Sequence, residues 1–276
     1  MPELPEVEHA ARCLRAWLRG QVVARAEAEN TRIFRGSDRR AFARALAGRR
    51  LLRLDRRGKH LLWSFDADVG LHCHLGMTGK WVVREPGEPP PRHSRARLYL
   101  SGGKVVHYND PRLFGRIAVC RAAALRELPQ IRALGPDPLH DGLEAERLQA
   151  ALKRTRRAVK VALLDQRVLA GIGNILATEA LFRARIHPAR PASSLSRRQV
   201  GSLVRGLEAS LRHTLASMTR EGKDAEVLYA QERAGEHPFL LYGRAGEPCP
   251  RCREPIARMR LGGRATAFCP RCQRAG

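Results

Sequence analysis

Hydrophobic positions in the first twenty residues recur at the spacing of an α-helix. They lie three or four residues apart, as on one helix face: Val7, Ala11, Leu14 and Leu18. Pro5 suits the first helical position, and Gly20 suits a helix stop. The pattern therefore predicts a helix over residues 5–19.

After residue 20 the pattern changes to short β-rich runs that are separated by turns. Eight runs are predicted as strands: 21–23, 49–54, 60–65, 70–75, 80–83, 96–100, 104–108 and 117–119. One short helix, 38–46, interrupts the series, and Ser101-Gly102-Gly103 predicts a hairpin turn. The proline-rich stretch 85–91 is expected to be a loop. Many short strands with regular turns indicate a sandwich or barrel, with the first helix packed alongside.

The second half of the chain has a helical pattern instead. The composition shifts around Gly135-Pro136-Asp137-Pro138, and helices are predicted over 143–153, 158–164, 174–182 and 196–218. Ser196 is a plausible N-cap for the last helix. The polar segment 219–236 is expected to be a mobile loop. These patterns predict an α+β fold with domains 1–134, 135–235 and 236–276.

Charge is the most unusual feature of the composition. The 51 Lys and Arg residues against 27 Asp and Glu give a net charge of +24. A charge of this size indicates a polyanionic partner, with nucleic acid favoured over an anionic membrane. No apolar run approaches the roughly 20 residues of a membrane span, and no signal-peptide core follows the N-terminus. A soluble intracellular protein is therefore expected.

Four of the seven cysteines form two C-P-x-C pairs near the C-terminus. Cys249 and Cys252 form the first pair, Cys269 and Cys272 form the second, and sixteen residues separate the two pairs. Two such knuckles can direct four thiolates at one ion, and Gly262-Gly263 suits the turn of a connecting hairpin. The sequence therefore predicts a structural Cys₄ site for one zinc ion, with iron as the alternative, in a reducing compartment. Arginines crowd the predicted hairpin, which favours a role in phosphate binding.

The first eight residues combine a candidate nucleophile with acidic groups. Removal of Met1 would leave Pro2 with a free secondary amine, which can attack an electrophilic carbon and form an iminium. Glu3 and Glu6 follow at a spacing that places both on one side of a first helical turn. The alternative is that Pro2 is merely tolerated after Met1 and that the glutamates are ordinary residues of a helix start.

Four further signals are weak when each is taken alone. In the Gly171-Ile172-Gly173-Asn174 turn, Asn174 and the helix N-terminus suit a phosphate, although a simple N-cap is the alternative. Phe114 and Met77 lie in polar or glycine-flanked turns, where an exposed apolar side chain can enter a base stack; the alternative is that both belong to the core. The basic turn 56–60 suits a phosphate or is a solvated charge run. Lys160 could be an ordinary solvated lysine.

Together these segments resemble one family from end to end, the bacterial formamidopyrimidine-DNA glycosylases (Fpg, or MutM) and their endonuclease VIII (Nei) relatives. The matching landmarks, in order, are residues 2–8, Arg57-Gly58-Lys59, His74-Leu75-Gly76-Met77, Asp110-Pro111-Arg112-Leu113-Phe114-Gly115, Gly171-Ile172-Gly173-Asn174 and the four cysteines. The resemblance implies an N-terminal β-sandwich flanked by helices, a helix–two-turns–helix element over 143–182 and a zinc-finger β-hairpin.

The resemblance also implies a role for each matching residue. Pro2 is expected to be the nucleophile, Glu3 the general acid and base, and Glu6 an orienting carboxylate. Lys59 is expected to be a catalytic residue that contacts a phosphate near the lesion. Further contacts to phosphates around the lesion are expected from His74, Asn174, Tyr242 and Arg264. Met77, Arg112 and Phe114 are expected to fill the gap left by the extruded nucleotide. His93 completes the expected DNA contacts, and Lys160 resembles a lysine near the damaged-base pocket.

The function implied is that of a bifunctional DNA glycosylase and abasic-site (AP) lyase of base excision repair. Such an enzyme removes oxidised purines through a Schiff base and then cuts the strand by β,δ-elimination, without a role for zinc in the chemistry. The expected partner is double-stranded DNA with oxidised bases or abasic sites, bound by a monomer in the cytoplasm at the nucleoid.

Two alternatives stay open at this point: a Nei-type enzyme for oxidised pyrimidines and a non-catalytic damaged-DNA-binding protein. Segment 219–236 corresponds to the loop that covers 8-oxoguanine in Fpg enzymes, and Lys223-Asp224-Ala225-Glu226 shows no clear match to it.

Overall fold

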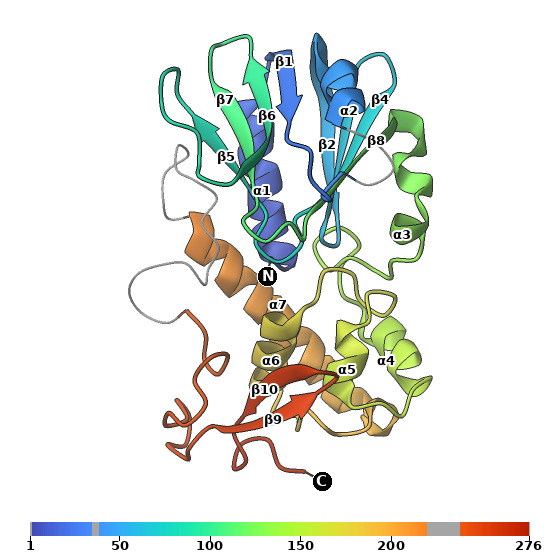
Figure 1. The fold of residues 1–276 in the computed structure, drawn as a ribbon. Helices are drawn as coiled ribbons and strands as arrows, with labels where there is room; N and C mark the ends of the chain where they lie inside the picture. Colours follow the sequence, from blue (N-terminus) through green and yellow to red (C-terminus); the bar gives the residue numbers. More distant parts are fainter. Residues whose placement is uncertain (1, 35–38, 220–237, 276) are drawn as a thin grey trace. The chain divides into compact units, whose positions relative to one another are not determined.

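The structure, a computed structural model, describes residues 2–34, 39–219 and 238–275. It divides the chain into two compact units (Figure 1): the first extends to Arg132, and the second begins at Ala133 and includes the C-terminal segment. The division into domains 1–134, 135–235 and 236–276 stays a prediction. Apart from Thr219, the segment predicted to be a loop, 219–236, lies outside the described residues.

The first unit is built on eight antiparallel strands in the order β5-β7-β6-β1-β2-β3-β4-β8. Their bounds are β1 (Val22–Ala28), β2 (Arg49–Arg57), β3 (His60–Phe65), β4 (Val69–His74), β5 (Lys80–Arg84), β6 (Ser94–Leu100), β7 (Val105–Asn109) and β8 (Arg116–Arg121). β1 pairs with β6 along most of its length but with β2 only at Val22 and Val23. The sheet therefore divides there into two four-stranded halves, which form the β-sandwich.

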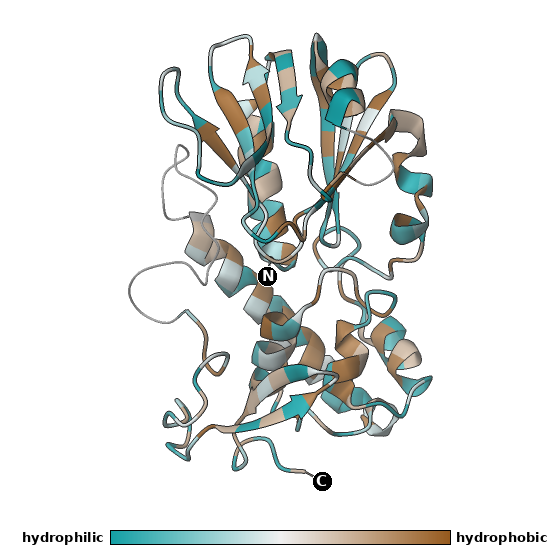
Figure 2. Ribbon diagram, viewed as in Figure 1, coloured by the Kyte–Doolittle hydropathy of each residue, from teal (hydrophilic) through white to brown (hydrophobic). Residues whose placement is uncertain are grey.

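The core of this unit lies between the two halves. Successive side chains of each strand point alternately into the space between the two halves and away from it, so that Leu61, Trp63 and Phe65 of β3 point into the core. Trp63 and Trp81 approach to 5.1 Å between ring centroids, and Trp81 approaches Tyr108 to 5.0 Å. Figure 2 shows hydrophobic segments on strands of both halves. The predicted sandwich, its hairpin at Ser101-Gly102-Gly103 and the loop after β5 are confirmed.

Helix α1 (Leu4–Trp17) packs against both halves of the sandwich, on β2, β3 and β5. Its predicted apolar face is confirmed, because Val7, Ala11 and Leu14 are fully buried and Leu18 is 2% exposed. Burial of each valine or leucine side chain stabilises the helix position by about 1.5–3 kcal/mol. Helix α2 (Arg39–Leu46) packs against β1 and β8. α1 thereby fixes the position of the N-terminal residues that precede it.

Two short helical segments follow β8, and the sequence pattern did not predict them. They are the 3₁₀-helix η1 (Ala122–Glu127) and α3 (Pro129–Arg132). η1 packs on the outer face of β3, β4 and β8 and buries Leu125. Segments of four to six residues are too short to show a helical repeat, which explains the omission.

In the part of the second unit that the structure describes, there are four α-helices and a β-hairpin. They are α4 (Ala145–Lys153), α5 (Val159–Leu164), α6 (Asn174–Arg183), α7 (Arg197–Thr219), β9 (Ala257–Leu261) and β10 (Arg264–Phe268), with a 3₁₀ turn, η2 (Ala192–Ser194), before α7. All four predicted helices are confirmed to within two residues at each end. The predicted N-cap is confirmed too, because Ser196 Oγ accepts from Gln199 N–H (3.3 Å) while Gln199 Oε1 accepts from Ser196 N–H (3.0 Å).

One buried carboxylate joins α6 to the segment that leads into the hairpin. Glu179, 4% exposed, accepts backbone hydrogen bonds of 3.0, 2.9 and 3.0 Å from Leu240, Leu241 and Tyr242. Arg183, one turn later on α6, lies 3.2 Å from the same carboxylate. Three backbone N–H groups and the guanidinium of Arg183 thus have the Glu179 carboxylate as their acceptor.

We expect Glu179→Ala to lower the free energy of unfolding by about 3 kcal/mol or more, because it leaves buried N–H groups and the Arg183 guanidinium without their acceptor. Urea denaturation followed by circular dichroism measures the loss. Glu146→Ala is the control: Glu146 also pairs with an arginine, Arg197, but both side chains are mostly exposed, so the change should be small. Equal effects of the two substitutions would contradict this assignment.

Candidate active site and zinc centre

The predicted catalytic residues lie at the start of α1. Glu3 is the N-cap, and its carboxylate accepts from the backbone N–H of Glu6. Glu6 reciprocates, with its Oε2 3.0 Å from Glu3 N, which completes a capping box. Pro2, directly before the cap, is buried, and Glu3 and Glu6 are only 2% and 1% exposed. The fold thus places two carboxylates and Pro2 together in a dry environment.

Burial also changes the protonation of this pair. It raises the pKa of Glu6 from 4.5 to about 7, and the nearby charge of Glu3 acts in the same direction. Glu6 therefore keeps its proton to a higher pH than an ordinary glutamate does. One carboxylate of the pair is available as an acceptor while the other can be neutral, an arrangement suited to proton transfer.

Asp110 organises the two loops that carry the predicted gap-filling residues, and sequence reasoning did not single it out. It is fully buried and accepts from Thr78 Oγ1 (2.7 Å), Arg112 N–H (3.2 Å) and Gly115 N–H (2.8 Å). Its own N–H donates to His93 O at 3.0 Å. The carboxylate of Asp110 therefore connects the loop after β4 to the loop after β7, and its backbone N–H adds the segment before β6.

The apolar tips of these loops are exposed. Met77 is 40% and Phe114 43% exposed, so the alternative that they belong to the core is wrong. The loops touch at the backbone: a Cβ on Gly76, whose φ is +67°, would lie 2.4 Å from the Phe114 carbonyl. The guanidinium groups of Arg112 and Arg32 lie 4.8 and 5.6 Å from the centre of the Phe114 ring. An exposed aromatic ring held between two cations suits contact with bases and phosphates.

The remaining predicted contacts of this unit are Lys59, His74 and His93. Lys59 lies in the turn between β2 and β3 and is 9% exposed. His74 ends β4, and its Nδ1 accepts from Gly76 N–H at 3.1 Å. Burial, followed by the positive charge of Lys59, lowers the pKa of His74 to about 4. His93 Nδ1 lies 3.4 Å from Arg95 Nη2, and its backbone contacts Asp110.

In the second unit, Lys160 and Asn174 both contact β10. Lys160 is fully buried, and its Nζ donates to Thr266 Oγ1 (2.8 Å) and Ala265 O (3.4 Å). Asn174 Nδ2 donates to the same Ala265 carbonyl at 3.1 Å. The alternative of a solvated lysine is therefore wrong. Arg264 is exposed at the start of β10, one residue from this carbonyl. Two predicted phosphate contacts, Asn174 and Arg264, are thus linked through β10.

The start of α6 differs from the simple N-cap considered for Asn174. Gly173 is the N-cap, and Asn174 is the first helical residue, with its side chain turned to the hairpin. The simple N-cap is therefore wrong. Tyr242 packs edge-on against Phe239, with 5.7 Å between ring centroids, and donates its N–H to Glu179.

The four cysteines of the two knuckles form one cluster in the part of the chain that the structure describes. Their sulfur atoms all lie within 4.8 Å of one another, with Cys249–Cys272 at 4.0 Å and Cys252–Cys269 at 3.4 Å. A tetrahedral zinc thiolate site, with Zn–S of about 2.3 Å, requires sulfur separations of about 3.8 Å. Arg251 N–H and Cys272 N–H point at Cys249 and Cys269 sulfurs, both at 3.4 Å. The set fits one closed structural zinc site.

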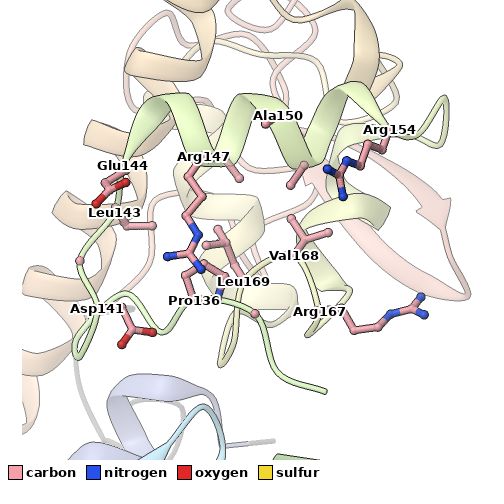
Figure 3. A pocket seen from close by; sticks show the side chains of 14 residues that line it. Pro136, Asp141, Leu143, Glu144, Arg147, Ala150, Arg154, Arg167, Val168 and Leu169 are labelled. Carbon is pink, nitrogen blue, oxygen red and sulfur yellow. The ribbon is translucent and has the colours of Figure 1, made fainter. Parts of the chain in front are cut away.

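A separate pocket of about 330 Å³ lies beneath α4 (Figure 3). Arg147 points into it from the helix, and Val168 and Leu169 lie opposite. No predicted catalytic, DNA-binding or zinc residue lines this pocket.

Comparisons with known proteins match every part of this arrangement. Residues 1–117 match the formamidopyrimidine-DNA glycosylase N-terminal domain, residues 134–223 the H2TH domain of the same enzyme, and residues 246–275 the zinc finger found in FPG and IleRS. The chain is 42% identical over 260 residues to the formamidopyrimidine-DNA glycosylase of Moorella thermoacetica, covering 94% of this chain and 95% of that protein. The chain belongs to the formamidopyrimidine-DNA glycosylase family.

Solved structures of family members agree with this fold. The crystal structure of MutM (Fpg) from Thermus thermophilus matches with a TM-score of 0.83 and 39% identity over 100% of both chains. Lactococcus lactis Fpg in complex with DNA containing an abasic site matches with a TM-score of 0.88 and 27% identity over 99% of this chain and 100% of that chain. The family match and the geometry of the cysteines together assign one structural zinc ion to this member of the family.

We expect Glu6→Gln to stabilise the protein more at pH 8 than at pH 5. The pKa of Glu6 is raised on folding from 4.5 to about 7, so its contribution to the free energy of unfolding falls as the pH rises through that window. A glutamine, which cannot ionise, should avoid a loss of about 3 kcal/mol by pH 8. Thermal melts of both proteins at several pH values measure this difference.

Glu8→Gln is the control of opposite sign. Burial raises the pKa of Glu8, but the hydrogen bond from Arg56 at 2.8 Å and its charge outweigh burial and hold the pKa below 4.5. Glu8→Gln should therefore destabilise at pH 8, and its effect should fade in acid. Parallel pH profiles for wild type and Glu6→Gln would contradict the raised pKa.

Removal of zinc should abolish DNA binding and lower the melting temperature, because Arg264 and the Ala265 carbonyl depend on the hairpin. Atomic absorption should find one zinc ion per chain, and a chelator should remove it, with recovery on adding zinc back. Cys252→Ser should lose the metal, whereas Cys120→Ser, in the other unit, should keep it. Unchanged DNA affinity after measured loss of zinc would argue against a supporting role of the hairpin.

Proposed function

We propose that this protein is a bifunctional DNA glycosylase and AP lyase of base excision repair that removes oxidised purines, including 8-oxoguanine and formamidopyrimidines, from duplex DNA. The observation that carries the proposal is the buried group at the start of α1, Pro2 beside the reciprocal Glu3–Glu6 pair. Family membership over the full chain supports the same conclusion. In the described residues no helix is long and apolar enough to cross a membrane. The proposed site of action is nucleoid DNA in the cytoplasm.

In the proposed reaction, Pro2 supplies the attacking nitrogen once Met1 is removed. A neutral amine is required, and the positive end of the α1 dipole disfavours a protonated one. Attack on C1′ of the damaged nucleoside displaces the base and forms an iminium between Pro2 and C1′. Glu3, as a carboxylate, accepts the proton that the Pro2 nitrogen loses and passes it to the sugar ring oxygen as the ring opens, while water protonates the departing base; Glu3 accepts protons again in the later steps. Glu6, hydrogen-bonded to the Glu3 backbone, orients it.

Strand cleavage follows from the iminium. It acidifies the C2′ protons, so that loss of one proton expels the 3′ phosphate in a β-elimination. A second, δ-elimination releases the 5′ phosphate, and water then hydrolyses the iminium and frees Pro2. The zinc site has four thiolate ligands and no open position, so it supports the hairpin without taking part in these steps.

The proposed DNA contacts divide into phosphate binding and gap filling. Phosphates are bound by Lys59, His74, Asn174, Tyr242 and Arg264. Exposure of Met77 and Phe114, with Arg112 beside the ring, supports insertion of these three side chains into the duplex. His93 lies on the segment that Asp110 ties to both tips, which supports a DNA contact for it as well.

Lys160 contributes to the damaged-base pocket in this proposal through the support that it gives to β10. The preference for oxidised purines rests on the relatives named formamidopyrimidine-DNA glycosylase, at 41% and 42% identity. A Lactococcus lactis Fpg complex with DNA containing an oxidised pyrimidine matches as well, so release of 8-oxoguanine and of thymine glycol should be compared directly.

Borohydride reduction of the enzyme with an 8-oxoguanine duplex should trap a covalent adduct through Pro2. Pro2→Gly should lower base release by about tenfold or more while the affinity for DNA stays close to that of wild type. Pro5→Ala, in the same first turn, is the matched control and should retain trapping. Intact-mass analysis must show that Met1 is absent. No adduct from protein without Met1, or equal loss of binding and base release, would refute the role of Pro2.

A further inference from the structure

Three histidines lie side by side on the outer face of β3 and β4, and only His74 has a role in the site described above. His60 is directly opposite His74 in the strand register, and their ring centroids are 4.8 Å apart. His72, 4% exposed, stacks on His60 at 5.1 Å and places its Nε2 2.8 Å from His60 Nδ1. His60 and His72 therefore lie against a predicted phosphate contact, His74, without a predicted DNA contact of their own.

All three rings are neutral at pH 7. Burial comes first among the causes in each case and lowers the pKa of His60 to about 2 and of His72 and His74 to about 4. The neighbouring charges are cationic and act in the same direction: Lys59 in the preceding turn and Arg116 opposite His74 on β8. η1, which covers this face, contributes Arg126, paired with Asp55.

Because each ring is neutral, it carries a single N–H proton, either on Nδ1 or on Nε2. His74 Nδ1 accepts from Gly76 N–H, so the His74 proton is on Nε2. Between His60 and His72, one nitrogen must donate and the other must accept. In either direction of this bond, one outer ring nitrogen of the pair carries the remaining proton, so the 2.8 Å hydrogen bond forms with either ring as the donor.

This arrangement leaves His74 with its Nδ1 engaged and its Nε2–H free of any described partner. On one side its ring is held by His60, which is itself held by His72. Because Gly76 N–H donates to His74, the same ring also braces the turn that presents Met77. The orientation of a phosphate donor and that of a gap-filling loop thus depend on one imidazole.

We propose that His60 and His72 are positioning residues, a hydrogen-bonded imidazole pair that fixes the His74 ring so that its Nε2–H points to a DNA phosphate. The inference rests on the proposed function, since it needs His74 to contact DNA. Lys59 then supplies the charge of this phosphate site, and His74 supplies a neutral, directed hydrogen bond.

The test compares His72→Leu with His72→Gln. Leucine removes the hydrogen bond to His60, whereas the glutamine amide can place a nitrogen near the position of Nε2 and restore it. For a duplex with a tetrahydrofuran abasic-site analogue, His72→Leu should raise Kd about five- to tenfold, and His72→Gln should recover most of the affinity. The slope of log K against log salt should not change, because a neutral donor releases no counterion.

Two further variants distinguish loss of the His72–His60 hydrogen bond from loss of a charged phosphate contact and from loss of a hydrogen bond elsewhere in the sheet. Lys59→Met should reduce the salt slope by about 0.9, as loss of one charged phosphate contact requires. Tyr99→Phe removes a 2.7 Å hydrogen bond to Glu27 in the other half of the sheet and should leave Kd unchanged. Thermal melts confirm that each variant is folded.

Nitrogen-15 NMR of the free wild-type protein provides an independent readout, since the His74 ring should show the Nε2–H tautomer. Wild-type affinity in His72→Leu, equal weakening by Leu and Gln, or an Nδ1–H tautomer of His74 would overturn the inference. Failure of the wild-type protein to bind the abasic analogue or to be trapped by borohydride counts instead against the proposed function, and the NMR result is unaffected by it.

Discussion

Burial of two carboxylates in a single helical turn is the constraint on which the proposed chemistry depends. A dry site disfavours two adjacent negative charges, so one proton is retained near neutral pH. The capping box stabilises this arrangement, because each side chain satisfies a backbone N–H of the other residue. The same hydrogen bonds that begin α1 therefore hold an acid–base pair next to Pro2. The β-sandwich contributes by burying the apolar face of α1 and excluding water from its first turn.

The second unit uses buried polar groups in a different way. Figure 2 shows a mixture of hydrophilic and hydrophobic residues on the strands of the zinc hairpin, and Cys249, Ile256 and Cys269 pack with Phe182 of α6 in an apolar cluster. Lys160, Glu179 and Gln273 add directed hydrogen bonds to Thr266, to the backbone of 240–242 and to Ile186 O. Arg251 adds a 4.3 Å contact with the ring of Phe182. Directed bonds fix the register of the hairpin on α6, which a smooth apolar contact would not.

The sequence predicted most of the elements because their patterns are local. The longer helices and seven of the strands in the first unit show the expected periodicity, and the spacing of the four cysteines specifies the zinc site. β1 is longer than predicted: Ala24 to Ala28 have low strand propensity, and pairing with β6 holds them extended. The roles of Asp110, Glu179 and Thr266 were not predicted for a similar reason. Each has a partner more than thirty residues away, namely Thr78, Leu241 and Lys160 respectively, and no spacing rule reveals a carboxylate that becomes buried.

The shared anchoring of Met77 and Phe114 has a consequence for how the protein would search a genome. Asp110 and the contact at Gly76 join the backbones that carry the two tips. If both tips enter the duplex as proposed, they would advance together, and their reach would be set by the backbone rather than by side-chain flexibility. A base step weakened by damage would then yield to the two tips more readily than a sound one.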